Sequence, residues 1–244
     1  MNYPQRVLNW ISGLIFPVRC IECGRFSSKN NGYICKKCIR SVPLNKKFEC
    51  IGCRRSSSLG LTCLTCRRTN HLDQLLVVSD YENSSVIKII KTFKYRFIKE
   101  MAIPISWLLK KYVFWLSAAR KFNLLTESPI IIPVPLHYRR LNWRGFNQAE
   151  LIAQSLSEIL NCNFDASLIK RTKIIKPQAE IEEREQRINN VRDIFQIIDR
   201  DKVKNKTVLL IDDVCTTGAT LNEGARILKE SGAAKIIGLV FARG

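Results

Sequence analysis

Residues 208–220 read Val-Leu-Leu-Ile-Asp-Asp-Val-Cys-Thr-Thr-Gly-Ala-Thr, and this stretch decides the fold. Its first four residues are apolar, as is typical of a buried strand in a parallel sheet. Asp212 and Asp213 follow at the predicted carboxyl end of the strand, and residues 216–220 open a predicted helix. Small residues at a helix start offer free backbone N–H groups and hydroxyl donors to an anion. Two carboxylates beside such a site suit a sugar phosphate, which carries hydroxyls as well as negative charge.

The same stretch resembles the PRPP-binding motif of type I phosphoribosyltransferases. The resemblance implies that Asp212 and Asp213 hold the 2- and 3-hydroxyls of the ribose of phosphoribosyl pyrophosphate (PRPP). It also implies a cradle for the 5-phosphate, formed by Thr216, Thr217, Gly218, Ala219 and Thr220. The plain alternative is a strand, an acidic turn and a Thr-capped helix without a ligand. The coincidence of all three features in the context that a phosphate loop requires favours the motif.

Strands and helices alternate after His71. Hydrophobic periodicity predicts strands at 75–79, 130–135, 208–211 and 236–241, and helices from Ser84 or Ser85, over 103–119, over 148–160 and after Thr220. The second strand ends sharply at Pro133-Val134-Pro135. We therefore predict an α/β domain over residues 71–244, with a parallel sheet flanked by helices in the type I phosphoribosyltransferase fold. Ligands of such sheets bind at the carboxyl ends of the strands.

Eight of the ten cysteines form four Cys-x2-Cys pairs: Cys20/Cys23, Cys35/Cys38, Cys50/Cys53 and Cys63/Cys66. Two such pairs can hold one metal ion in a closed tetrahedral site. We predict an N-terminal domain over residues 1–70, formed by an amphipathic helix and a double zinc ribbon with two structural Zn²⁺ ions. Pairing of consecutive Cys pairs is the simplest arrangement, and crossed pairing stays open. A disulfide framework is disfavoured because no export signal is apparent.

The formal charge is +19, and it is uneven. Residues 1–150 hold 25 basic and 8 acidic side chains, whereas residues 151–244 hold 15 and 13. Such an excess favours polyanions as partners. The apolar stretches 7–16 and 103–119 are too short or too interrupted to span a bilayer. We therefore expect a cytoplasmic protein without a membrane span.

The expected reaction is displacement of pyrophosphate at C1 of the ribose, if the chain turns PRPP over. That reaction needs positioned PRPP, a Mg²⁺ ion and cations for the leaving group rather than a protein nucleophile. The catalytic candidates are Asp212, Asp213, Lys94 and Arg187. Further cations that could meet PRPP are Arg139, Arg140, Arg144 and Arg184.

The whole chain resembles the ComF competence-protein family. The resemblance rests on the Phe16-Pro17 end of the first segment, the four Cys pairs, Tyr81-Glu82, Lys94, Pro133-Val134-Pro135, Arg144-Gly145-Phe146-Asn147-Gln148, Gln178 with Arg187-x-x-Asn190-Val191, and the terminal PRPP motif. It implies a double zinc ribbon fused to a phosphoribosyltransferase domain. It also implies a role in DNA uptake and natural transformation, with single-stranded DNA and other DNA-uptake proteins as partners. The segment 173–187 departs from the family in being unusually acidic.

A second interpretation belongs to a different class. The chain would be a single-stranded nucleic-acid-binding module that keeps its PRPP pocket as a sensor, without turnover. The basic excess of residues 1–150 supports it, as do the aromatics Phe93, Tyr95 and Phe97 among cations, since stacking and charge together hold single strands. The sequence does not identify an acceptor base. A glutamine-dependent amidotransferase is disfavoured, because position 2 is Asn rather than Cys.

Overall fold

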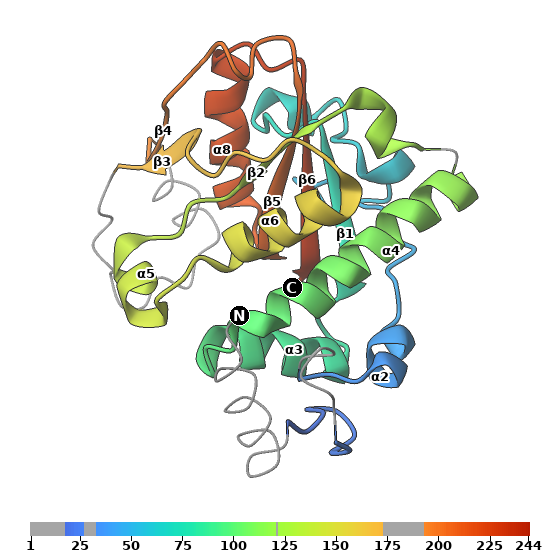
Figure 1. Ribbon diagram of the computed structural model, residues 1–244. Coiled ribbons are helices and arrows are strands. Elements are labelled where there is room, and N and C mark those ends of the chain that lie inside the picture. Colours follow the sequence, from blue (N-terminus) through green and yellow to red (C-terminus); the bar gives the residue numbers. More distant parts are fainter. Residues whose placement is uncertain (1–17, 27–32, 121, 173–192) are drawn as a thin grey trace.

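The core of the protein is a four-stranded parallel sheet, seen in a computed structural model that describes residues 18–26, 33–120, 122–172 and 193–244. The strands lie in the order β1-β6-β5-β2 (Figure 1). Their bounds are Gln74–Asp80 for β1, Ile130–Pro133 for β2, Thr207–Cys215 for β5 and Lys235–Arg243 for β6. The predicted parallel sheet is confirmed. The phosphate-loop strand β5 lies inside the sheet, paired with β6 on one side and β2 on the other.

Helices cover both faces of the sheet (Figure 1). α3 (Ser84–Tyr95), α4 (Ala102–Arg120) and α6 (Gln148–Leu160) share one hydrophobic core, and α8 (Ala219–Glu230) belongs to the other. The alternation of strand side chains explains the two cores. In β5, Leu209 and Ile211 enter the α3/α4/α6 core, whereas Val208 and Leu210 enter the α8 core.

Several predicted element ends are wrong. β5 continues through Asp212 and Asp213 to Cys215, because β6 pairs with it as far as Cys215–Arg243. The acidic pair therefore lies within the strand instead of after it. The cap of α3 is Asn83, whose side chain accepts hydrogen bonds from two backbone N–H groups of the first turn, and not Ser84 or Ser85.

Shorter elements were not predicted. They are α2 (Lys36–Ser41), α5 (Tyr138–Arg144), the antiparallel pair of β3 (Ile169–Arg171) and β4 (Phe195–Ile197), and the 3₁₀ turns Ser58–Gly60, Cys66–Arg68, Lys99–Met101 and Leu124–Glu127. The pair β3–β4 brackets residues 173–192, so the predictions for Gln178, Arg184 and Arg187 lie outside the described residues. The predicted amphipathic helix before Pro17 also lies outside them.

The cysteine-rich segment packs on both faces of the sheet. Cys20, Ile34 and Ile39 join the α3/α4/α6 core, whereas Ile51 joins the α8 core. The residues around the first two Cys pairs therefore pack on one face of the sheet, and those around Cys50 and Cys53 pack on the other. The division at residue 70 remains a prediction. Within the described ranges, no helix combines the length and the apolar character needed to cross a bilayer.

Candidate functional site

The acidic pair of β5 meets a lysine from a neighbouring helix. Lys94, in the last turn of α3, places its Nζ 2.9 Å from Oδ1 of Asp213. Both side chains are largely buried. Asp212 is tied to the same place, because its Oδ1 accepts a hydrogen bond of 2.8 Å from the Asp213 backbone N–H. The structure thus brings together three residues that the sequence placed in one site from positions far apart in the chain.

Burial raises the pKa of Asp212 to about 7, and the negative charge of Asp213 acts in the same direction. Lys94 and Arg140 act in the opposite direction. Arg144 also lies within electrostatic range, because Asp213 counteracts the lowering of its pKa by burial. The acidic pair is thus surrounded by three cations, as a site for a highly charged phosphate ester requires.

The loop after β5 has the geometry of an open helix start. Gly218 is the N-cap of α8 and has a φ of +81°. Because glycine has no side chain, it makes no capping hydrogen bond to the first turn of the helix. Such a φ is strained for residues with a side chain, so glycine fits this position. The Thr217 hydroxyl oxygen accepts from the Ala219 N–H at 3.3 Å, and Thr216 is exposed. Cys215, the last residue of β5, is buried.

The residues around Cys50 and Cys53, which we call the second cysteine region, pack against this loop. Arg54 donates from Nη2 to the Thr216 carbonyl at 3.1 Å and to the Gly244 carbonyl at 2.7 Å. A Cβ placed on Gly218 would lie 2.7 Å from Cγ1 of Ile51, so the Ile51 side chain fills the space beneath the loop. The sequence did not predict either contact with the loop. The only signal was a pair of arginines directly after the Cys50/Cys53 knuckle.

Further hydrogen bonds join the second cysteine region to α8 and to the carboxyl end of β6. Asn222, in the first turns of α8, donates to the Thr69 carbonyl at 3.0 Å and accepts from the His71 N–H at 2.6 Å. Arg243, near the end of β6, donates to the Ile51 carbonyl at 2.8 Å and to the Cys50 carbonyl at 3.4 Å. The backbone around the second cysteine cluster is therefore hydrogen-bonded to β6, the strand beside β5, and to α8, the helix that follows the loop.

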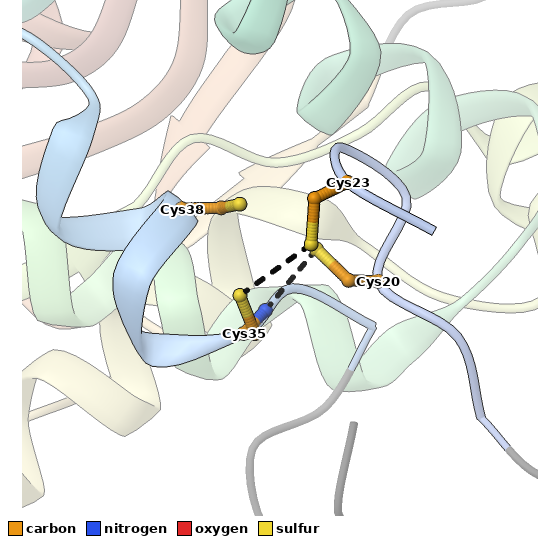
Figure 2. Close-up of side chains that lie close together, drawn as sticks. All are labelled: Cys20, Cys23, Cys35 and Cys38. Atoms are coloured by element: carbon orange, nitrogen blue, oxygen red, sulfur yellow. Dashed lines mark hydrogen bonds between the residues drawn. The ribbon is translucent and has the colours of Figure 1, made fainter. Parts of the chain in front are cut away.

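The eight paired cysteines form two groups of four. Cys20, Cys23, Cys35 and Cys38 make one group, and Cys50, Cys53, Cys63 and Cys66 make the other. In each group all four sulfurs lie within 4.8 Å of one another. Pairing of consecutive Cys pairs is thus confirmed, and crossed pairing is wrong. Figure 2 shows the first group, in which the four side chains converge from the knuckle at residues 20–23 and from the start of α2.

The sulfur spacing suits a tetrahedral metal ion. Cys23 and Cys35 place their sulfurs 3.9 Å apart, and so do Cys53 and Cys63. A tetrahedron with metal–sulfur bonds of about 2.3 Å has sulfur–sulfur edges of about 3.8 Å. Backbone N–H groups also point at the sulfurs, as at Cys20 and Cys50, each of which accepts one at 3.4 Å. Burial opposes ionisation of these two thiols, but N–H donors outweigh it and lower the pKa of Cys20 to about 7 and of Cys50 to about 6.

Not every predicted cation lies at the acidic pair. The Arg139 Nε donates to the Tyr138 hydroxyl at 3.0 Å, and its charge, like that of Arg140, lowers the pKa of His137. Burial is the larger cause of that lowering. A cavity of about 300 Å³ lies beside this cluster, between the loop after β2 and strand β3, and Arg171 is part of its wall. The charge of Arg171 also lowers the pKa of His137, so this arginine belongs to the same cluster of cations.

Comparison with known proteins identifies the class of domain first. The phosphoribosyl transferase domain matches residues 144–244, which include β5, the loop and α8. Among solved structures, the purine phosphoribosyltransferase from Pyrococcus horikoshii Ot3 is similar with a TM-score of 0.31 and 20% identity, over 57% of this chain and 86% of that chain.

Full-length relatives then identify the family. DNA utilization protein YhgH of Escherichia coli O157:H7 is 31% identical over 225 residues, which cover 91% of this chain and 96% of that protein. Competence protein F of Haemophilus influenzae is 30% identical over 91% of this chain and 95% of its own length. Competence protein ComFC of Bacillus subtilis is 26% identical over 86% and 83%. The chain belongs to the ComF family, and its resemblance to that family is confirmed.

Proposed function

We propose that this protein binds PRPP at the carboxyl end of β5. Asp212 and Asp213 would hold the ribose hydroxyls, and the loop from Thr216 to Thr220 would hold the 5-phosphate. The observation that carries the proposal is the acidic pair near the end of a strand, followed within five residues by a helix start whose N-cap glycine has a φ of +81°. The first N–H groups of a helix have no partner within the helix and can bind an anion. In α8 the first of them, that of Ala219, donates to the Thr217 hydroxyl oxygen.

The ion pair of Lys94 and Asp213 has a role in this proposal. While the two side chains are paired at 2.9 Å, Lys94 neutralises the carboxylate to which a ribose hydroxyl would otherwise donate a hydrogen bond. When a ribose hydroxyl donates to Asp213, the Lys94 ammonium group is released for the negative charge of the leaving pyrophosphate. Arg140 and Arg144 lie within electrostatic range of the same carboxylates. Arg139 and Arg187, predicted for the same ligand, keep their roles as expectations.

Two metals complete the proposal. The two groups of four cysteines would each hold one structural Zn²⁺, since four sulfurs at tetrahedral spacing are typical of closed zinc sites. Mg²⁺ prefers carboxylate and phosphate oxygens, and Asp212 and Asp213 are the carboxylates at the site. When bound with PRPP, it would offset charge on the pyrophosphate. Asp212 and Asp213 would position the sugar.

The cellular role follows from the family. Relatives are named for competence and DNA utilization, so we propose that this protein acts on incoming DNA in the cytoplasm during natural transformation. Single-stranded DNA and other DNA-uptake proteins would be its partners. The basic excess of residues 1–150, 25 basic against 8 acidic side chains, supports a polyanion partner.

Calorimetry with PRPP in the presence and absence of Mg²⁺ tests the site. Asp212→Asn and Asp213→Asn should each weaken binding about tenfold, because each removes a hydrogen bond to a charged group, which contributes about 1.5–3 kcal/mol. Asp201→Asn is the matched control, because it changes the same charge at an exposed position. Unchanged affinity in the Asp212/Asp213 double variant would show that the ribose is bound elsewhere.

The alternative function is nucleic-acid binding with PRPP as a sensed ligand and no turnover. The buried ion pair of Lys94 and Asp213 is the observation that supports this alternative, because a carboxylate paired with a lysine is less accessible to a ribose hydroxyl. Pyrophosphate release from PRPP and Mg²⁺, with a panel of nucleobases and with or without single-stranded DNA, separates the two. Release in any mixture supports transfer. PRPP binding without release in every mixture supports the sensor.

A further inference from the structure

Three exposed aromatic rings stand together next to the acidic pair. Tyr95, Phe97 and Trp143 expose 59%, 38% and 59% of their surface. The Trp143 ring lies 6.4 Å from Tyr95 and 5.1 Å from Phe97 between centroids, in edge-on contacts. We call these three residues the aromatic platform. Large aromatic side chains gathered at the surface mark binding sites far more often than single exposed rings do.

The backbone beneath the platform is strained. Phe97 has a φ of +56°, a conformation that bulky side chains rarely adopt. Such strain is stabilised by its surroundings and gathers at functional sites. Phe97 follows α3, and Trp143 lies in α5, so two separate segments supply the rings. Packing between Phe93 and Phe146, at 5.6 Å between ring centroids, fixes these segments to each other below the surface.

The two chain segments that carry the platform are rich in basic residues. Residues 94–99 and 138–144 contain six Lys and Arg side chains and no Asp or Glu. Arg144 lies over two of the rings, with its guanidinium carbon 5.9 Å from the Tyr95 centroid and 5.7 Å from that of Trp143. Its buried Nε has no hydrogen-bond partner among the described residues. A partner for this surface must therefore offer both flat apolar groups and negative charge.

The platform also has a fixed position relative to the proposed PRPP site. Tyr95 directly follows Lys94, which pairs with Asp213. Arg144 links the rings to the same carboxylate, since it lies against both aromatic residues and within electrostatic range of Asp213. A planar group stacked on Trp143 would thus lie near the proposed ribose site.

We propose that the aromatic platform binds unpaired bases of a single-stranded nucleic acid beside the PRPP site. The bases stack on Trp143 and Tyr95, and Arg96, Arg139 and Arg140 contact the phosphates. Every base has a flat face that can stack on an aromatic ring, so binding depends little on base sequence. A duplex hides these faces and is a poorer ligand. The position of the platform rests on the proposed function, whereas its binding of bases does not.

An abasic oligonucleotide tests stacking directly, because it keeps the phosphates and lacks the bases. We expect a labelled 15-mer of thymidine to bind at least tenfold more tightly than its abasic counterpart in anisotropy titrations. Trp143→Ala should remove most of this difference and leave abasic binding unchanged, whereas Trp143→Phe should keep it. Trp107→Ala is the matched control, since Trp107 is also exposed, at 49%, but lies in α4. Equal affinity for both strands, or equal losses in the two Trp variants, would overturn the proposal.

Two additional measurements separate this proposal from the proposed function and from other occupants. PRPP calorimetry on Trp143→Ala should match the wild type. If wild-type protein does not bind PRPP but still distinguishes the two strands, the PRPP proposal fails and the platform stands. If PRPP binds and the strands are not distinguished, the platform proposal fails alone. Thymidine monophosphate binding as tightly as the 15-mer would identify a free nucleotide as the occupant and overturn the assignment to a strand.

Discussion

The two cysteine clusters share their ligands, spacing and sulfur geometry, but they lie in different surroundings. The first cluster packs beside α2 and on the α3/α4/α6 core, and its link from Glu22 to Lys88 is an exposed ion pair of 3.4 Å. The second cluster lies behind the phosphate loop, where Arg54 and Ile51 contact the loop itself. Two similar modules therefore stabilise different parts of the protein.

The difference follows from where each knuckle meets the sheet. The residues around Cys50 and Cys53 lie at the carboxyl ends of β5 and β6, since Arg243 at the end of β6 donates to two of their carbonyls. Ligands of parallel sheets bind at those ends. The second cluster therefore stabilises the conformation of the phosphate loop, through the hydrogen bonds of Arg54 and the buried side chain of Ile51. The first cluster has no comparable contact among the described residues.

Removal of one metal ligand from each cluster is the strongest test of this comparison. Cys53→Ser and Cys23→Ser change equivalent exposed positions, the second cysteine of the first knuckle in each cluster. Metal binding contributes most of the folding free energy in small zinc modules. Cys53→Ser should therefore disorder the support of the loop and abolish measurable PRPP binding in calorimetry. Cys23→Ser should lose one metal per chain by elemental analysis and keep its PRPP affinity within about threefold.

Two results would contradict the comparison. Equal loss of PRPP binding in both variants would show that either cluster is needed only for the general fold. Unchanged binding in Cys53→Ser, with its metal lost, would show that the loop is independent of the second cluster. Circular dichroism and thermal unfolding of both variants distinguish a local change from global unfolding.

Gly218 tests the packing of the loop on Ile51. Gly218→Ala should destabilise the protein by about 2–4 kcal/mol, because it combines a left-handed φ with a side-chain overlap. Gly145→Ala is the matched control, with a φ of +74° and no atom within 4 Å of its added Cβ. Gly145→Ala should lower the free energy of unfolding by about 1 kcal/mol, because only the backbone strain of the left-handed φ contributes. Urea unfolding measures both. A Gly218→Ala loss no larger than that of Gly145→Ala would show that Ile51 does not restrict the loop.

Arg54 tests the hydrogen bonds between the second cluster and the loop. Arg54→Ala removes donors to the carbonyls of Thr216 and Gly244 and should weaken PRPP binding about tenfold. Arg55→Ala removes the same charge from the neighbouring exposed position. It should reduce PRPP affinity less than twofold. Similar losses in both variants would assign the effect to net charge and not to the loop contact.

This contact also changes how DNA binding must be tested. Lys36, Lys37, Arg54 and Arg55 are basic residues next to the cysteines and contribute to the charge excess of residues 1–150, but Arg54 is hydrogen-bonded to the phosphate loop. Neutralising Lys36, Lys37 and Arg55 alone keeps the loop intact. The salt dependence of single-strand affinity in that variant then reports on phosphate contacts only.

Much of the fold could be predicted because it rests on local patterns. The helix 148–160 follows from its apolar period, and the four Cys pairs follow from their spacing, although the structure was needed to exclude crossed pairing. The joining of Lys94 to Asp213 could be expected only as a shared site, since 119 positions separate them and sheet order decides their contact. Arg54 and Ile51 could not be found, because their importance comes from the docking of the ribbon on the loop. The true end of β5 depended on its pairing with β6.

The pH dependence of PRPP affinity gives the smallest and most selective test. Burial and the charge of Asp213 raise the pKa of Asp212 to about 7. A ribose hydroxyl donates to the ionised carboxylate, so affinity should increase by several-fold, and at most about tenfold, from pH 6 to pH 8. The same shift has the opposite sign for folding. Because the folded state keeps a proton that the unfolded state releases above its ordinary pKa, stability from this group falls as pH rises towards 7.

Asp212→Asn separates this titration from that of the ligand. PRPP phosphates also ionise near neutral pH, so the profile of the variant gives the contribution of the ligand alone, and the difference from wild type belongs to Asp212. Cys23→Ser should keep the wild-type profile, because the first cluster lies away from the acidic pair. A wild-type profile that coincides with that of Asp212→Asn would show that Asp212 stays ionised down to pH 6. In that case Lys94 and Arg140 outweigh burial, and the site is more open to solvent than its packing indicates.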